Sequence, residues 1–346
     1  MFKSDCFLLR ILKALGVWFG YDRLKCEQLN WEPKVAKFEN VLKSWGKRDL
    51  THYGKILIVN ALALSQLSYL ASMIVVPENV IQKVDRLIYN FITKGLGKMN
   101  KKVLAGPLHE GGCNMPMFKW KVIALKFMWI VRLTDGRNAC WKNYPFYLFD
   151  PYSDFSILRD VFSDTRISTE PFVSRLPLFY QHVLKAWNSI PPLLDVSSTV
   201  NTILWNCKYH VFVNVKRSVE YIEIQSKKVY LVKLKTRDVY RFLVSCVTQP
   251  ASTLSWQYEF GKDIVWKDVW TLAHRITNES KLRAFHWKFL HKKCINNVKL
   301  YLWKIRENAL CRFCNVNDTV RHRYFDCIIA KEVWGIVCRK HRREIV

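Results

Sequence analysis

The feature that most constrains this sequence is a set of three cysteines and one histidine near its C-terminal end. They follow the spacing Cys311-x2-Cys314-x7-His322-x4-Cys327. A short C-x2-C turn followed by a histidine and a cysteine about one turn apart can close a tetrahedron of soft and borderline ligands, the arrangement that Zn²⁺ prefers. Three thiolates and an imidazole leave no open coordination position, so the predicted zinc ion is structural rather than catalytic.

The alternative is that these are ordinary buried cysteines. Zinc is favoured because the segment is polar and basic and holds little else that would fold a loop, whereas structural zinc contributes on the order of 10 kcal/mol. Cys338 and His341 are spare candidate ligands. They lie beyond a helix predicted from the spacing of Ala330, Val333, Trp334 and Val337. The remaining cysteines are scattered, which is typical of reduced, intracellular thiols.

Charge and composition exclude a disordered polycation. The chain of 346 residues has 55 Lys and Arg against 28 Asp and Glu, a net charge of +27. A charge that large favours polyanionic partners. Half of the residues are hydrophobic and 14 are tryptophan, so the chain has enough apolar material to fold. Its length allows two or three domains.

The positive charge is concentrated around the cysteine cluster. Residues 280–346 hold 16 Lys and Arg against five acids, a net charge of +11, which makes this segment the main candidate for contact with a polyanion. The predicted contact residues are Lys281, Lys288, Lys292, Arg312, Arg321 and Arg323. The three lysines form a stripe beside a predicted apolar helix face of Leu282, Phe285 and Phe289. A solvated charged face is the alternative for any one of them.

Three aromatic residues interleave with these charges. Trp287, Phe313 and Tyr324 are candidates for stacking on unpaired bases. For each of them taken singly, core packing is the favoured interpretation.

Helical periodicity predicts a mainly α fold. Apolar side chains recur at helical spacing over residues 35–45, 80–91 and 119–133. Between the first two, Ile56–Val76 is a stretch of 21 residues without a charge, long enough to span a bilayer. Polar residues interrupt it every few positions, so a helix buried between its neighbours is favoured over a membrane span. The three segments from 35 to 91 are therefore predicted to form a bundle.

The middle of the chain has fewer regular signals. Prolines and serines predict a loop-rich connector with short helices from residue 134 to about 200. Between Val219 and Val232, VEYIEI and VYLV flank the polar QSKK, which predicts a β-hairpin with four residues between its strands, the only clear strand signal. Helical spacing resumes at Val239 and continues to the cysteines.

Several segments carry a family pattern. They are LGVWFG (15–20), LKSWGKRDLTHYGKILIVNALALSQLSYL (42–70), VPENVIQKVDRLIYNFI (76–92), GPLHEGGCNMP (106–116), ALKFMWIVRL (124–133), VWKDVW (265–270) and KLRAFHWKFLH (281–291). The first three resemble the thumb of reverse transcriptases from non-LTR, LINE-type retrotransposons, and the next two resemble the Gly–Gly loop and helix that follow it. The last two, with the cysteine cluster and Trp334, resemble the reverse-transcriptase zinc-binding domain.

The resemblance implies four parts: residues 1–30, the end of a palm remnant; 31–135, a thumb-like helical bundle; 136–235, the connector with short helices and a hairpin; and 236–346, a basic helical zinc-binding domain with a zinc knuckle. Family polymerases hold two metal ions with aspartates of the fingers and palm, and an Asp–Asp pair is their landmark. No Asp–Asp pair occurs in this sequence, and no endonuclease segment is recognised. We therefore expect a truncated chain that lacks the fingers, palm and endonuclease and is not an enzyme.

These observations predict a non-catalytic module that binds RNA, DNA or both. Lys47, Arg48 and Lys55 of the thumb are expected to contact a duplex backbone, while the zinc region contacts single-stranded RNA or a DNA junction. A full-length reverse transcriptase acting in trans is a further candidate partner, no membrane association is expected, and the expected location is intracellular, in the nucleus, the cytoplasm or both. The alternatives are an inert relic of a transposable element, a polymerase accessory in trans and, least favoured, retained polymerase activity.

Overall fold

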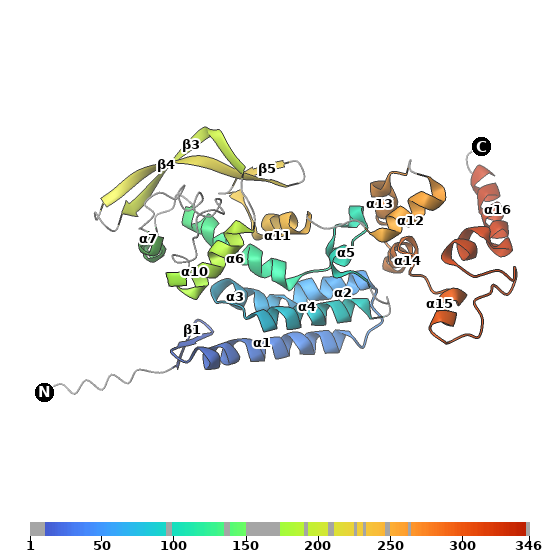
Figure 1. Ribbon diagram of the computed structural model, residues 1–346, viewed down its shortest axis with the longest axis horizontal. Helices are drawn as coiled ribbons and strands as arrows, with labels where there is room; N and C mark the ends of the chain where they lie inside the picture. The colour runs from blue at the N-terminus through green and yellow to red at the C-terminus, as the bar shows by residue number, and fades with distance from the viewer. Residues whose placement is uncertain are drawn as a thin grey trace. The chain divides into compact units, whose positions relative to one another are not determined.

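The computed structural model describes residues 11–94, 99–134, 139–149, 174–189, 193–206, 211–224, 227–230, 233–245, 250–261 and 264–343. Part of the predicted palm remnant, residues 1–10, and part of the predicted connector, residues 150–173, lie outside this set. The described chain is mainly helical, as the sequence predicts (Figure 1).

The chain forms two compact units. Unit 1 comprises Met1–Leu50, Gly54–Ile92 and Asn114–Val247, and unit 2 comprises Thr51–Tyr53, Thr93–Cys113 and Thr248–Val346. The four family-based domains remain predictions, but the contacts group two segments differently. Residues 93–113 pack with the C-terminal helices, and the helix after residue 235 packs in unit 1.

Unit 1 begins with a tight hairpin against a long helix. Strands β1 (Ile11–Ala14) and β2 (Val17–Gly20) pair antiparallel, and α1 (Arg23–Trp45) follows. The side chain of Asp22 accepts a hydrogen bond from the N–H of Lys25 at 3.0 Å and so caps α1. The predicted apolar spacing of α1 is confirmed, because its buried side chains include Val35, Phe38 and Leu42.

The uncharged stretch is buried on one side only, since Leu57 and Tyr69 are at least half exposed, and it is not one helix. It forms α2 (His52–Ile58), the π-helical turn η1 (Val59–Ala63) and α3 (Ser65–Met73), with a bend of 49° between the two arms. The hydroxyls of Ser65 and Ser68 bond the carbonyls of Leu62 and Leu64, each at 2.7 Å, and such bonds bend helices. No single described helix is long and apolar enough to cross a membrane, although this bent pair meets the same criteria of length and composition.

The centre of unit 1 is α6 (Phe118–Thr134). Asp85 of α4 (Glu78–Thr93) accepts hydrogen bonds from the N–H groups of Phe118 and Lys119, at 2.6 and 3.3 Å, and holds the N-terminus of α6. Helices α3, α10 (Leu178–Asn188) and α11 (Thr236–Ser245) pack on α6. Phe127 stacks on Trp187 with ring centroids 5.4 Å apart. The short elements η3 (Cys140–Lys142) and α7 (Asn143–Phe149) follow α6 in the chain.

Unit 1 also holds a sheet that the sequence predicts only in part. Strands β3 (Leu193–Asn206), β4 (Val211–Ile224) and β5 (Lys227–Tyr230) pair antiparallel in that order. The predicted hairpin is confirmed as β4 and β5, but two residues rather than four separate the strands, since Ile224 pairs with Lys227. The prediction of loop for residues 193–200 was wrong. Serines and an aspartate obscure the β-branched residues of β3, which pairs with the next strand, β4, from Asn206 and Val211 outward.

Unit 2 consists of short helices. They are α5 (Lys101–Ala105), η2 (Leu108–Glu110), α12 (Ala251–Phe260), α13 (Trp266–Ile276), α14 (Ser280–Leu290), α15 (Asn297–Leu302), the π-helical turn η5 (His322–Asp326) and α16 (Ile328–Arg343). The predicted apolar face of α14 was wrong. Leu282 and Phe285 are about half exposed, and the buried side chains are Ala284, Trp287 and Leu290.

The buried face of α14 bonds the glycine-rich loop. The indole N–H of Trp287, which is 3% exposed, donates to the carbonyls of Gly111 and Gly112, each at 3.1 Å. The Nε2 atom of His291 lies 2.7 Å from the Gly111 carbonyl. Burial lowers the pKa of His291 to about 4, which keeps the imidazole neutral. The loop predicted as a connection between helices is therefore an integral part of the C-terminal unit.

Two glycines allow this close packing. Gly111 has a φ of +85°, and a Cβ there would lie 2.7 Å from Pro250 and 2.8 Å from Trp270. A Cβ on Gly112 would lie 1.9 Å from the carbonyl oxygen of Gly106. Neither position accepts a side chain without a shift of the backbone or of a packed ring.

We predict that Gly112→Ala destabilises unit 2 by about 1–3 kcal/mol, because the added methyl group overpacks a backbone contact. Hydrogen exchange over residues 280–291 measures the effect. The matched control is Gly335→Ala on α16, where a Cβ meets nothing within 4 Å and alanine favours the helix. Equal exchange in both variants would contradict the prediction.

A buried lysine leads to a second prediction. Lys126 is 1% exposed, its ammonium donates to the Ile74 carbonyl at 2.8 Å and it lies 4.2 Å from the ring centroid of Phe179. Burial lowers its pKa to about 7. Lys126→Met should therefore raise the free energy of unfolding by about 1–4 kcal/mol at pH 7 and below.

The gain has a defined pH dependence. Above pH 7 the unfolded chain keeps a proton on Lys126 that the folded chain has lost, so wild-type stability rises with pH and the advantage of methionine shrinks. Calorimetric melting at pH 6.5 and 9.5 measures this, beside Lys119→Met, which removes an exposed charge from the same helix. A Lys126→Met protein less stable than the control at both pH values would overturn this assignment.

Candidate metal centre

Two short turns bring the four predicted ligands together. Cys311 and Cys314 lie in a loop closed by the antiparallel bridge between Leu310 and Asn317. The N–H of Cys311 donates to the Val316 carbonyl at 2.8 Å, and Asn315 takes a left-handed conformation with a φ of 55°. Both ends of this loop are therefore fixed by backbone bonds.

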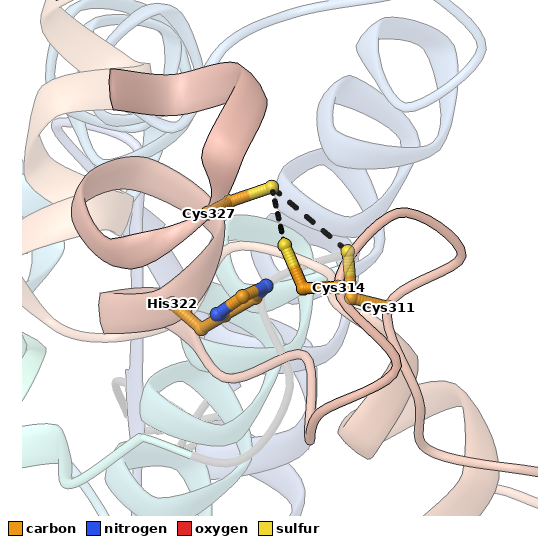
Figure 2. Close-up of side chains that lie close together, drawn as sticks. All are labelled: Cys311, Cys314, His322 and Cys327. Atoms are coloured by element: carbon orange, nitrogen blue, oxygen red, sulfur yellow. Dashed lines mark hydrogen bonds between the residues drawn. The ribbon is translucent and has the colours of Figure 1, made fainter. Parts of the chain in front are cut away.

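The other two ligands lie at the two ends of the π-helical turn η5. The N–H of Cys327 donates to the carbonyl of His322 at 2.7 Å, which spans five residues. The N–H of His322 donates to the Thr319 hydroxyl at 3.0 Å. The wide turn sets both side chains on the side that faces Cys311 and Cys314 (Figure 2).

The ligand atoms form one compact cluster. The three sulfurs and an imidazole nitrogen lie within 4.8 Å of one another. The Cys327 sulfur lies 3.9 Å from that of Cys311 and 3.7 Å from that of Cys314. A tetrahedral Zn²⁺ with Zn–S bonds of about 2.3 Å requires sulfurs about 3.8 Å apart. The observed separations match this value.

The ligand atoms are also suited to binding a cation. His322 Nε2 is buried and has no hydrogen-bond partner among the described residues, so its lone pair is available to a metal. Backbone N–H groups of Phe313 and Cys314, together with the imidazole of His322, lower the pKa of Cys311 to about 6. The N–H of Ile328 points to the Cys314 sulfur at 3.4 Å. These residues fit Zn²⁺ in a closed, structural site.

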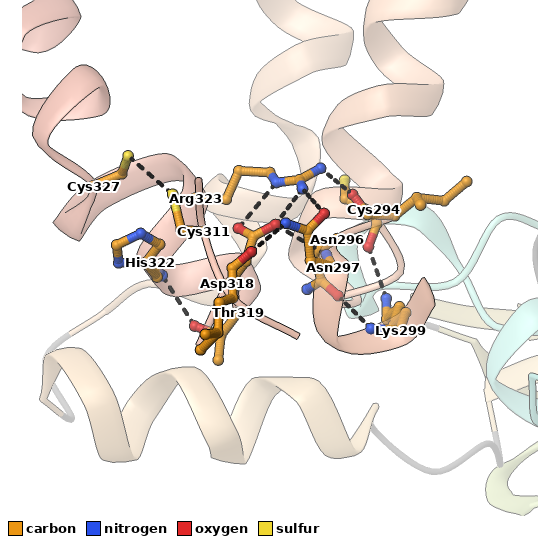
Figure 3. Close-up of polar contacts among 12 residues, drawn as sticks. Cys294, Asn296, Asn297, Lys299, Cys311, Asp318, Thr319, His322, Arg323 and Cys327 are labelled. Carbon is orange, nitrogen blue, oxygen red and sulfur yellow. Dashed lines mark hydrogen bonds and ion pairs between the residues drawn. The ribbon is translucent and has the colours of Figure 1, made fainter. Parts of the chain in front are cut away.

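A buried ion pair joins the metal loop to the preceding helix (Figure 3). Asp318 is 2% exposed, and both of its carboxylate oxygens accept hydrogen bonds from the guanidinium of Arg323. Its Oδ2 also accepts from the N–H of Asn297 at 2.9 Å, at the start of α15. Arg323 additionally donates to the Ile295 carbonyl at 2.6 Å. The pair fixes the base of the loop, a role that no local sequence pattern indicates.

The predicted nucleic-acid residues fall into two groups. Three have internal partners. Arg323 binds Asp318, Arg321 binds Asp326 at 3.1 Å, and Lys292 binds Glu259 and donates to the Ser255 hydroxyl at 2.6 Å. Their charged groups are engaged in holding unit 2 together.

The other predicted contact residues present more of their charge to solvent. In unit 2, Lys281 and Arg312 are exposed and Lys288 is half-buried. In unit 1, Lys47 and Arg48 are exposed at the end of α1, and Arg48 lies over the ring of Trp45 at 4.1 Å. Lys55 is half-buried, 5.9 Å from the ring centroid of Phe91. The structure thus gathers the unit 2 group around the metal loop and α14.

The three aromatic candidates for base stacking differ in burial. Trp287 is in the core, as the favoured interpretation has it, and Tyr324 is half-buried against Phe285 and Phe289. Phe313 is 54% exposed and is not a core residue. The spare ligand Cys338 lies exposed on α16 outside the cluster, and the side chain of His341 is outside the described residues. Arg306, an exposed residue near the metal loop, was not among the predicted contact residues.

A family described as "zinc-binding in reverse transcriptase" matches residues 252–334, a span that includes all four ligands. Residues 252–334 are thus similar to the zinc-binding domain of reverse transcriptases. The chain is also similar to a Xenopus laevis protein named Transposon TX1 uncharacterized 149 kDa protein, with 26% identity over 212 residues. That alignment covers 59% of this chain and 16% of the relative. The resemblance to the C-terminal part of a retrotransposon reverse transcriptase is confirmed.

The geometry of this zinc-binding domain leads to a prediction about metal removal. Cys314→Ser should lower the zinc content from about one ion per chain and raise hydrogen exchange over residues 303–327, because structural zinc supplies on the order of 10 kcal/mol. Acidification should also release the metal, because the thiolate ligands are protonated as the pH falls. Elemental analysis and hydrogen exchange measure both effects.

The matched control is Cys338→Ser, which removes a thiol from exposed α16. It should leave both the zinc content and the exchange unchanged. Loss of zinc in this control, or retention in Cys314→Ser, would show that the ligand set is wrong.

Proposed function

We propose that this chain is a non-catalytic, nucleic-acid-binding part of a LINE-type retrotransposon reverse transcriptase, whose zinc site orders a basic surface that binds RNA or DNA. The observation that carries the proposal is the net charge of +11 over residues 280–346, around a site with the geometry for zinc. Solubility alone does not require charge of a single sign. Phosphate groups are the common polyanionic target of such a surface.

The ion pairs of unit 2 define which cations carry the binding. Arg321, Arg323 and Lys292 neutralise acids of the same unit. No ion pair is described for Lys281, Lys288 or Arg312. We assign the phosphate contacts to these three residues, with the internal pairs supporting the surface on which they lie.

Unit 1 contributes a thumb-like surface. Lys47 and Arg48 follow the end of α1 at Gly46, and Lys55 lies on α2. Their proposed partner is the backbone of a duplex, which is recognised by charge rather than by sequence.

We propose a non-catalytic role because the sequence has no match to the paired aspartates of polymerase active sites. Two-metal polymerases hold their ions with paired aspartates, and this sequence has no Asp–Asp pair. Binding in trans to a full-length reverse transcriptase is a further proposed role. The proposed location is the nucleus, the cytoplasm or both, without a membrane partner.

A second candidate function is favoured by one observation. Ile328, Val333, Trp334, Ile336 and Val337 of α16 are each about half exposed, and exposed apolar area promotes association. An inert transposon relic would aggregate or associate with itself through such a surface. A monodisperse protein that melts cooperatively contradicts this second candidate.

Salt-dependent binding tests the proposal. The logarithm of the binding constant should fall steeply with the logarithm of salt concentration, for structured RNA and for a nicked DNA duplex. The double variant Lys281→Gln/Lys288→Gln should lower that slope by about 1.4 on single strands and about 1.8 on duplexes, because each lost phosphate contact removes about 0.7 or 0.9.

The control is Lys185→Gln/Lys267→Gln, which removes the same charge from exposed positions elsewhere. Its slope should stay close to that of the wild-type protein. Binding that is insensitive to salt, or equal slopes in the two double variants, would be evidence against the assigned surface.

A further inference from the structure

A cavity of about 520 Å³ opens beside the metal loop within unit 2. Residues of the metal loop, of the turn η5 and of α16 line most of it. Its lining includes Arg306, Arg312, Phe313, Tyr324, Val333 and Trp334. A cavity of this size is in the range that holds a small organic group.

The aromatic lining is exposed and partly fixed in orientation. The indole N–H of Trp334 donates to the Tyr324 carbonyl at 2.8 Å, while the side chain remains 50% exposed. Phe313, which also lines the cavity, is about half exposed. A flat apolar group in the cavity would cover exposed aromatic surface, and the hydrogen bond of Trp334 reduces the entropy lost when it does so.

The charge of the cavity selects an anion. Asp318 is the acid among its lining residues, and Arg323 neutralises it. Arg306 and Arg312 are exposed, and the described structure gives neither an ion pair. The guanidinium of Arg312 lies 4.7 Å from the ring centroid of Phe313, so a cation and a stacking surface are adjacent.

We propose that this cavity binds one unpaired nucleotide of an RNA or DNA strand, with its base against Phe313 and Trp334 and its phosphate beside Arg306 and Arg312. This inference rests on the proposed function and adds the substrate class. Base–aromatic stacking tolerates any sequence, so the site distinguishes unpaired from paired strands rather than one base from another. An apolar peptide fits the rings but leaves both guanidinium groups without a counterion.

The test uses the zinc-loaded full chain and short single-stranded oligonucleotides of mixed sequence, as RNA and as DNA, beside a duplex of the same sequence. Phe313→Leu keeps apolar bulk but removes the ring, and should weaken single-strand binding about 5-fold or more while duplex binding is unchanged. Phe313→Trp should restore it. Because Phe313 is exposed, folding is unaffected. Tyr258→Ala, at an exposed ring of α12, is the control and should bind like wild type.

Charge and position are tested separately. Arg312→Gln should lower the salt slope for single strands by about 0.7, whereas Phe313→Leu should leave the slope unchanged. Lys331→Gln, on α16 outside the lining residues, serves as the charge control. Oligonucleotides containing 5-iodouridine should crosslink to the peptide that holds Phe313 or Trp334.

The outcomes separate this inference from the general proposal. Intact, salt-sensitive binding that is indifferent to Phe313→Leu and Arg312→Gln overturns the nucleotide site and leaves the basic surface standing. Absence of any nucleic-acid binding overturns both. A change of oligomeric state in Phe313→Leu without oligonucleotide would identify the cavity as a contact between copies of the chain and would also overturn the inference.

Discussion

The cluster of three thiols and one imidazole governs the fold of the C-terminal residues. Residues 301–308, which lead into the cluster, are exposed throughout, and the loop itself buries few apolar side chains besides Val320. Hydrophobic burial at about 25 cal/mol per Å² therefore cannot hold this segment alone. A metal held by these four ligands would take the place of a core here. The Asp318–Arg323 pair and the turn η5 contribute by fixing the direction from which each ligand arrives.

The glycine-rich loop also stabilises the C-terminal unit. Its carbonyls at Gly111 and Gly112 satisfy the N–H of Trp287 and bond His291, two polar groups that α14 buries. An unsatisfied buried donor costs about 1–3 kcal/mol, so the loop allows α14 to present a buried tryptophan and histidine. The zinc-binding domain matched at residues 252–334 therefore depends on a segment more than a hundred residues earlier in the chain.

Sequence patterns could predict what is local. The metal ligands follow from spacing because they lie within 17 residues of one another, and helix α1 follows from its apolar period. Non-local features could not be predicted in this way. Strand β3 was missed for a different reason: it pairs locally with the next strand, β4, but its serines and aspartate obscure its β-branched residues. The face of α14 was misassigned because Leu282 and Phe285 are apolar but exposed, while the buried His291 is polar and bonds the Gly111 carbonyl of the distant loop.

The difference between local sequence and non-local surroundings also explains why two arginines of the metal loop have different roles. Arg312 and Arg323 are equivalent in sequence, since each lies in or beside the cysteine cluster, yet their surroundings give them different chemistry. Arg323 pairs with a carboxylate that is 2% exposed, and removing Arg323 would leave that buried charge without compensation. Arg312 contacts solvent and the face of Phe313, and its guanidinium therefore remains available to bind a phosphate group. Net charge therefore identifies the surface, but the internal acids decide which of its cations remain available for a ligand.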